Sequence, residues 1–208
     1  MTTGRRVQLA IKQVIDTVGS AVGLLLLSPL LLLIAVAIKL TSKGPVLFRQ
    51  DRIGKGARAF RICKFRTMVA GAANMGTGIR TAADDPRITR VGRLLRRFSL
   101  DELPQLLNVL GGSMSLVGPR PTIPEQVAEY GPFERRRLGM KPGITGWASV
   151  NGRNLNPWPV RIRLDVEYVD RFSLWMDLRI LLRTVVVVVK GEGVYRAPGG
   201  APPPPGAA

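Results

Sequence analysis

The 208-residue sequence contains no histidine and a single cysteine, Cys63. Without histidine, the chain cannot form a Ser-His-Asp triad, a histidine general base or a histidine-ligated zinc or iron site of its own. One cysteine excludes an internal disulfide and a four-cysteine metal site. Acid–base and nucleophilic chemistry must therefore come from Asp, Glu, Lys, Tyr, Ser, Thr or Cys63.

Acidic residues are also scarce, since 14 Asp and Glu stand against 31 Lys and Arg and give a formal net charge of +17. The hydrophobic content is 46%, which is too high for a disordered basic tail. The length suits one domain with at most an appended segment. These features predict a folded protein with a polyanionic partner, which can be nucleic acid, anionic lipid or a phosphorylated substrate.

The longest uncharged run covers residues 17–38, between Asp16 and Lys39. As a helix these 22 residues would extend about 33 Å, enough for a bilayer core of about 30 Å. Pro29 lies in the middle of the run, directly after Ser28. A proline removes one backbone donor and kinks a helix, and the Ser28 hydroxyl is a candidate partner for the freed carbonyl. Each half then spans only about half of a bilayer.

Basic residues lie on both sides of this run. Arg5, Arg6 and Lys12 precede it, and the residues that follow it are Lys39, Lys43, Arg49, Arg52, Lys55, Arg58 and Arg61. Both ends favour the cytoplasm under the positive-inside rule, whereas a single span would place one of them outside. The sequence therefore favours a re-entrant helical hairpin in one leaflet, broken at Ser28-Pro29. A kinked true span and a soluble core helix are the alternatives.

The expected fold class is mixed α/β and mainly helical. Residues 1–40 would form the re-entrant membrane helix and its basic flank, residues 41–196 a compact cytosolic catalytic domain with interfacial amphipathic helices and short strands, and residues 197–208 a disordered Pro/Gly/Ala tail. Short strands should flank a glycine turn at 54–56. The apolar spacing predicts helices over 89–98, 125–138, 160–168 and 174–189. The first of these also carries a basic stripe, which suits either a solvated face or anionic headgroups.

The strongest chemical signal is the pair of adjacent carboxylates, Asp101 and Glu102, in the segment 99–105. Ser99 and Glu102 have the spacing of a helix capping box, which is the purely structural alternative. Pro104 argues against a regular helix here and favours an irregular backbone. Because adjacent helical residues point about 100° apart, one carboxylate could face a reacting phosphorus while the other binds a cation.

Two further segments suit anion binding. Arg120 lies between Pro119 and Pro121, so a stiff backbone would present a guanidinium suited to bidentate phosphate binding, unless it is an ordinary surface-loop arginine. The glycine-rich segments 141–147 and 151–154 could expose backbone N–H groups to an anion that Arg153 also reaches.

Taken together, these motifs resemble the bacterial sugar transferase family, the monotopic polyprenyl-phosphate phosphoglycosyl transferases, in its small form that is only the catalytic core. The resemblance covers about residues 8–195. It rests on Ser28-Pro29 and on the motifs at 64–68 (KFRTM), 85–89 (DPRIT), 99–105 (SLDELPQ), 114–121 (MSLVGPRP) and 141–146 (KPGITG). Departures from the family pattern are Phe98, Ser113 and Ser149, which bear on local hydrogen bonding and sugar preference rather than on the catalytic groups.

The resemblance implies that a UDP-sugar gives its phospho-sugar to undecaprenyl phosphate on the cytoplasmic face of the bacterial inner membrane, and that UMP leaves. This would be the first membrane step of a surface glycan, such as an exopolysaccharide, a capsule, an O-antigen or a glycoprotein glycan. Asp101 matches the nucleophile that forms a covalent intermediate, and Glu102 its partner, both associated with Mg²⁺. Arg120 and Arg153 match residues near the phosphates. The same phosphate-binding set is expected to include Lys64, Arg66 and Arg96.

The chemistry is consistent with these roles, because a carboxylate is ionised at neutral pH and attacks without a histidine base. Mg²⁺ and arginines would neutralise the diphosphate. An anionic phospholipid membrane is the further expected partner, nucleic acid is not expected, and the sequence allows an oligomer. The rival hypotheses are direct metal-assisted transfer, with Asp101 as a metal ligand, and a non-enzymatic basic protein that binds nucleic acid or anionic lipid through the cluster at 87–97.

Overall fold

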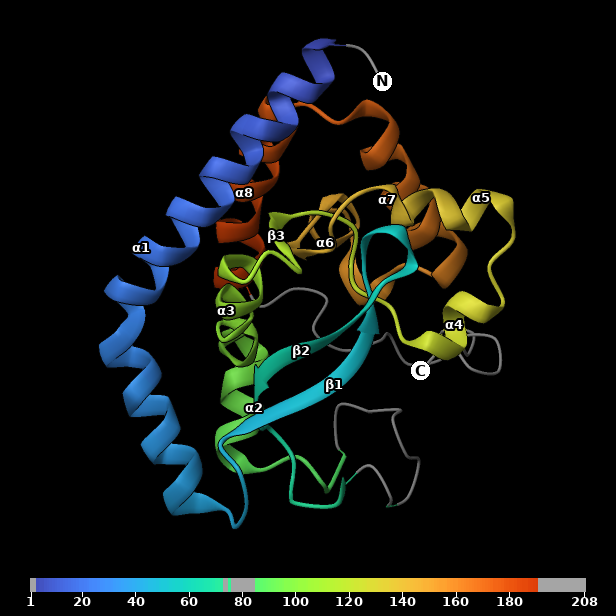
Figure 1. The fold of residues 1–208 in the computed structure, drawn as a ribbon. Coiled ribbons are helices and arrows are strands. Elements are labelled where there is room, and N and C mark those ends of the chain that lie inside the picture. The colour runs from blue at the N-terminus through green and yellow to red at the C-terminus, as the bar shows by residue number, and fades with distance from the viewer. Residues whose placement is uncertain (1–2, 73–74, 76–84, 191–208) are drawn as a thin grey trace.

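The computed structural model describes residues 3–72, 75 and 85–190 (Figure 1). The predicted tail at 197–208 lies outside these residues. The elements of the first half are α1 (Thr3–Thr41), β1 (Leu47–Ile53), the 3-10 turn η1 (Lys55–Ala57), β2 (Ala59–Phe65), α2 (Arg90–Arg97), the 3-10 turn η3 (Leu100–Glu102) and α3 (Gln105–Leu110). Those of the second half are β3 (Ser115–Val117), α4 (Pro124–Ala128), α5 (Pro132–Arg135), η4 (Arg136–Gly139), β4 (Gly143–Thr145), α6 (Trp147–Val150), η5 (Arg153–Leu155), α7 (Trp158–Arg171) and α8 (Leu174–Lys190).

The described chain is mainly helical with a few short strands, as expected from the sequence. β1 and β2 form an antiparallel hairpin in which Leu47 lies opposite Phe65 and Ile53 opposite Ala59. β3 and β4 form a separate parallel pair. Figure 1 shows α1 along one side of the molecule, with α2 and α3 between it and the hairpin. This arrangement places the segment between α2 and α3, which carries the two adjacent carboxylates, next to β2.

Helix α1 is one continuous bent helix rather than the two separate helices of a hairpin (Figure 1). The cause of the bend is Pro29, which cannot donate to the carbonyl of Leu25. The Ser28 hydroxyl donates to that carbonyl at 2.7 Å, which confirms the partner predicted for it. The serine thus restores the hydrogen bond that the proline removes, and the helix continues through the bend.

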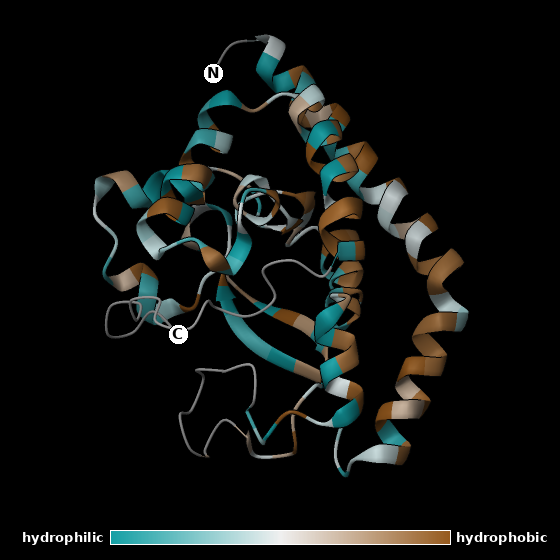
Figure 2. Cartoon of the chain, turned by 180° about the vertical axis from the view of Figure 1, so that it is seen from behind, coloured by the Kyte–Doolittle hydropathy of each residue, from teal (hydrophilic) through white to brown (hydrophobic). Residues whose placement is uncertain are grey.

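The surface of α1 is unusually apolar. Leu25, Leu26, Leu32 and Leu33 are each 65–73% exposed, and Figure 2 shows that the half of α1 after the bend is predominantly hydrophobic. By length and composition, α1 could cross a membrane, and only 11% of its most apolar stretch is buried. A core helix of a soluble protein would be mostly buried, so this exposure argues against that alternative.

Both halves of α1 pack against the domain that follows it. In the first half, Lys12 Nζ lies 2.6 Å from Asp177 Oδ2 on α8, and Asp16 Oδ1 accepts a hydrogen bond from the backbone of Leu116 at 3.0 Å. In the second half, Ile34 and Ile38 pack with Phe65 and Leu95. Lys12 is therefore not a free flanking charge, as the sequence suggested, but half of a buried ion pair.

The helix predicted over residues 125–138 is instead three short pieces, α4, α5 and η4. The interruption falls at Gly131, which has an extended backbone (φ −73°, ψ −179°) before Pro132. The residue before a proline is disfavoured in the helical region, so the chain turns there and restarts with Pro132 at the first position of α5. The other helices predicted after residue 41 are confirmed, and so are the two short strands on either side of the glycine turn at 54–56.

Candidate active site

The two adjacent carboxylates lie on η3, a single 3-10 turn between α2 and α3. Ser99 precedes it with a left-handed backbone (φ +55°) and makes no side-chain cap. Its hydroxyl instead accepts a hydrogen bond from Arg153 Nη2 at 2.7 Å. The capping-box interpretation is therefore wrong, and the irregular backbone expected from Pro104 is confirmed.

Glu102 is the buried member of the pair, with 7% of its surface exposed. Its Oε1 accepts from Lys64 Nζ on β2 at 2.9 Å and from Arg120 Nη2, and its Oε2 accepts from Arg120 Nη1 at 3.1 Å. Burial alone would raise the pKa of Glu102, but the charges of Arg120 and Lys64 lower this pKa well below its ordinary value. Glu102 is thus held as a carboxylate, with most of its acceptor positions filled.

Asp101 contrasts with its neighbour. It is partly exposed, and its carboxylate makes no hydrogen bond or ion pair with the residues described. Burial raises the pKa of Asp101, as does the charge of Glu102, while Lys64, Arg96 and Arg120 oppose the rise. A more basic and unpartnered carboxylate is a better nucleophile than one already bonded, and it lies within the field of several cations.

Arg120 is as rigidly held as its flanking prolines predicted. Gly118 N donates to Thr145 O, and Gly143 N donates to Pro119 O, each at 2.9 Å. Gly118 must be glycine, because a Cβ there would collide with the carbonyl of Lys141. The Arg120 carbonyl also accepts from Arg137 Nη2 at 2.8 Å. The backbone is therefore fixed on both sides of Arg120, whose guanidinium donates to both carboxylate oxygens of Glu102.

The structure brings four of the five predicted phosphate-binding residues to this place. Lys64 and Arg120 bind Glu102, Arg153 binds Ser99, and Arg96 Nε donates to Thr67 Oγ1 at 2.9 Å within electrostatic range of Asp101. The 87–97 cluster is not one continuous basic surface, because Arg87 is buried in an ion pair with Asp85. This weakens the idea of a nucleic-acid-binding stripe.

Arg66 is the exception. Its guanidinium donates to the carbonyls of Ser42 and Lys43, at 2.9 and 2.5 Å, immediately after α1 ends. β2 ends at Phe65, so Arg66 no longer shares the strand face of Lys64. Gly44 (φ +114°) leaves the room that this side chain fills. Arg66 thus ties the end of α1 to β2 and does not face the carboxylate pair.

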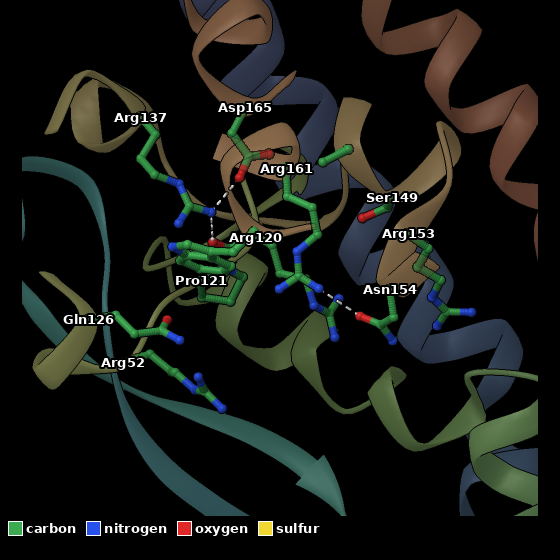
Figure 3. A pocket seen from close by; sticks show the side chains of 12 residues that line it. Arg52, Arg120, Pro121, Gln126, Arg137, Ser149, Arg153, Asn154, Arg161 and Asp165 are labelled. Carbon is green, nitrogen blue, oxygen red and sulfur yellow. Dashed lines mark hydrogen bonds and ion pairs between the residues drawn. The ribbon is translucent and has the colours of Figure 1, made fainter. Parts of the chain in front are cut away.

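A cavity of about 130 Å³ opens beside Arg120 (Figure 3). Arg120 and Arg153 connect it to the carboxylate pair, because both line it and also bind the segment 99–102. Its lining residues are Arg52, Arg120, Pro121, Gln126, Arg137, Ala148, Ser149, Arg153, Asn154, Trp158, Arg161 and Asp165. Five are arginines, and the one acid, Asp165, is paired with Arg137. The cavity therefore favours an anionic ligand.

Several of these residues were not found by sequence reasoning. Arg52 counted only as a charge near the membrane run, and Gln126, Arg137 and Arg161 stood in helical patterns without a motif. Trp158 lies beside them, with its ring under the guanidinium of Arg161 at 5.0 Å. Two departures from the family pattern are also placed: Ser149 lines the cavity, and Ser113 Oγ donates to Asn108 O at 3.1 Å.

The carboxylate pair fits a divalent cation of the Mg²⁺ type. Within the described ranges, no group of three or more Asp, Glu, Cys or His could hold a metal unaided. Mg²⁺ in phosphate sites is bound by one or two carboxylates together with substrate phosphates, so a third protein carboxylate is not required for such a site. Of about four acceptor positions on a carboxylate, Glu102 uses three. Asp101 uses none of its own among the residues described, which leaves oxygen ligands available.

Comparison with known proteins adds independent findings. The family described as "Bacterial sugar transferase" matches residues 7–191. The chain is 47% identical over 189 residues to a UDP-glucose:undecaprenyl-phosphate glucose-1-phosphate transferase of Xanthomonas campestris pv. campestris, covering 86% of the chain and 39% of that protein. It is 44% identical to an undecaprenyl-phosphate glucose phosphotransferase of Komagataeibacter xylinus, covering 84% and 35%. It is 43% identical to the exopolysaccharide production protein PSS of Rhizobium leguminosarum bv. phaseoli, covering 89% and 98%. The chain thus spans less than half of the first two relatives and nearly all of the third.

Proposed function

Since the chain belongs to the bacterial sugar transferase family, we propose that it transfers a phospho-sugar from a UDP-sugar to undecaprenyl phosphate. The products are undecaprenyl-diphospho-sugar and UMP, at the first membrane step of a bacterial surface glycan. The observation that carries this proposal is the arrangement of Asp101 and Glu102. One carboxylate is unpartnered among the described residues, and the other is held by Lys64 and Arg120. The relatives' names supply the substrates.

In the first half-reaction, an Asp101 oxygen attacks the phosphorus that bears the sugar. The bond between this phosphorus and the oxygen bridging to the nucleotide breaks, and UMP leaves with the electron pair. Arg120 and Arg153 lie where they can neutralise the phosphate oxygens, and Glu102 fixes the Arg120 guanidinium. The carboxylates of Asp101 and Glu102 would hold Mg²⁺, whose chemistry here is to screen the charge of the diphosphate from the anionic nucleophile.

In the second half-reaction, an oxygen of undecaprenyl phosphate attacks the same phosphorus. The Asp101–phosphorus bond breaks, the carboxylate is regenerated, and the new diphosphate bond joins sugar phosphate to lipid. Both nucleophiles are anions, so neither step requires a general base. This explains how a chain without histidine could catalyse the whole reaction.

The same proposal includes a re-entrant position for α1 in the cytoplasmic leaflet. Lys12 and Asp16 near one end, and Ile34 and Ile38 near the other, all pack against the same domain. A helix that crossed the bilayer would carry one of its ends away from a domain confined to the other side. The exposed leucines around the Ser28-Pro29 bend would then enter the hydrocarbon.

Labelling of single cysteines tests this topology. We expect Arg6→Cys and Lys43→Cys to react with a membrane-impermeant thiol reagent only after the cells are permeabilised, because both ends of α1 face the cytoplasm. Cys63 is buried and should give little background. Reaction of position 6 in intact spheroplasts would instead demonstrate a true span.

The activity is tested by UMP release from a panel of UDP-sugars in the presence of undecaprenyl phosphate. We expect release with at least one donor, its loss when EDTA is added, and its recovery with excess Mg²⁺, because two adjacent carboxylates cannot approach a diphosphate without a cation. The proposal is contradicted if no donor yields UMP, and the metal assignment is contradicted if EDTA has no effect.

A further inference from the structure

Gln126 is a buried side chain that lacks a partner. It is 6% exposed and lines the cavity beside Arg120. Its amide makes no hydrogen bond with the residues that the structure describes, and Figure 3 shows it directed toward the interior of the cavity. Because the amide opens onto the cavity and has no partner among the described residues, a ligand that is polar at this end can bind it.

Arg52 and Arg161 add positive charge to the same space. Arg52 Nη2 donates to Gln50 Oε1 at 2.7 Å, but its buried Nε has no partner. Burial and the neighbouring charge of Arg120 lower the pKa of Arg52 to about 10. Arg161 is aimed by the Trp158 ring below it and by Asn154 Oδ1 at 2.9 Å. An anion between these guanidinium groups would relieve their mutual repulsion.

The direction of the reaction suggests which anion enters. In a phosphoryl transfer the attacking and leaving oxygens lie roughly in line with the phosphorus. Asp101 attacks from the side of η3, so the leaving group must extend away from it. The cavity begins at Arg120 and Arg153, which contact the segment 99–102, and continues to Arg161, Arg52 and Gln126. Its volume of about 130 Å³ suits one end of a sugar nucleotide rather than the whole molecule.

We propose that this cavity is the subsite of the leaving nucleoside monophosphate, in which Arg52 and Arg161 bind the phosphate of UMP and the Gln126 amide binds the edge of the uracil ring. Uracil presents an N–H donor beside carbonyl acceptors, and a glutamine amide supplies the complementary acceptor and donor. This inference rests on the proposed transferase function and deepens it, since it assigns the nucleotide half of the donor to residues that no motif identified.

The test is calorimetric binding of UMP and of ribose 5-phosphate to the full chain in lipid nanodiscs, without turnover. Wild-type protein should bind UMP more tightly than ribose 5-phosphate. Gln126→Leu should weaken UMP binding by about tenfold and leave ribose 5-phosphate unchanged, because only UMP carries the base. Arg161→Gln should weaken both ligands to a similar degree, by roughly ten- to a hundredfold.

Two controls keep the result specific. Gln13→Leu makes the same chemical change on α1, outside the cavity, and should alter neither affinity. Gln126→Asn keeps the amide but shortens the side chain by one methylene. It should therefore reduce UMP affinity less than Gln126→Leu does. Unchanged UMP binding in both Gln126 variants, or equal binding of UMP and ribose 5-phosphate by the wild type, would overturn the assignment. A protein that releases no UMP from any UDP-sugar yet shows the predicted binding would refute the transferase function alone.

Discussion

Replacing Asp101 with asparagine is expected to lower the rate of UMP release by at least about a thousandfold. The amide is nearly isosteric but is a very weak nucleophile, so the phosphorus–oxygen bond to the enzyme cannot form. Asp101 makes no hydrogen bond with the described residues, so its loss should disturb the fold little. The measurement is the initial rate of UMP release. Asp170→Asn, an exposed aspartate on α7 that pairs with Arg136, is the matched control.

A single-turnover experiment separates the covalent route from direct metal-assisted transfer. When undecaprenyl phosphate is omitted, the covalent route still releases about one UMP per enzyme molecule and leaves labelled phospho-sugar on the protein. Direct transfer releases none under the same conditions. Activity retained in Asp101→Asn, or the absence of any labelled protein in the wild type, would show that Asp101 is not the nucleophile.

Changing Arg120 to lysine is expected to lower kcat/KM by about a hundredfold, although the positive charge is kept. Arg120 spans both oxygens of Glu102 through two separate nitrogens, and one ammonium group cannot reproduce this fork. Its rigid backbone, fixed through Gly118 and Pro119, also leaves a lysine little freedom to compensate.

The matched control for this variant is Arg171→Lys, an exposed arginine that pairs with Glu167 one turn away on α7. It should have normal kinetics, since a surface pair of this kind contributes little. Thermal unfolding of both variants should be recorded, so that a kinetic loss is not confused with unfolding. If the kcat/KM of Arg120→Lys is within about threefold of the wild-type value, the two-point binding of Glu102 by Arg120 is not needed for activity.

Features set by local chain chemistry could be predicted from the sequence. The bend at Pro29 and its repair by Ser28 follow from a missing N–H and a hydroxyl one residue away. The irregular turn at η3 follows from Pro104, and the stiffness around Arg120 from two prolines. In each case the deciding interaction spans only a few residues, so no knowledge of the tertiary arrangement was needed.

Features that depend on where long side chains reach could not be predicted. Lys12 binds a carboxylate on α8, far along the chain, and Gln126 reaches the cavity only because α4 lies beside β1. Arg66 was expected in the same phosphate-binding set as Lys64, yet β2 ends at Phe65 and the Arg66 side chain binds the carbonyls that follow α1. Such side chains have many rotamers, and only the packed neighbours decide among them.

The ion pair between Lys12 and Asp177 has a practical consequence for anyone seeking a water-soluble fragment. Deleting α1 would leave the Asp177 carboxylate buried without Lys12. Removing one partner of a buried ion pair typically lowers the free energy of unfolding by about 3–5 kcal/mol. The deletion would also uncover Phe65 and Leu95, which Ile34 and Ile38 now shield. Helix α1 is thus an integral part of the packed structure. A variant that is soluble without detergent should therefore replace the exposed leucines of α1 with polar residues and keep the helix itself.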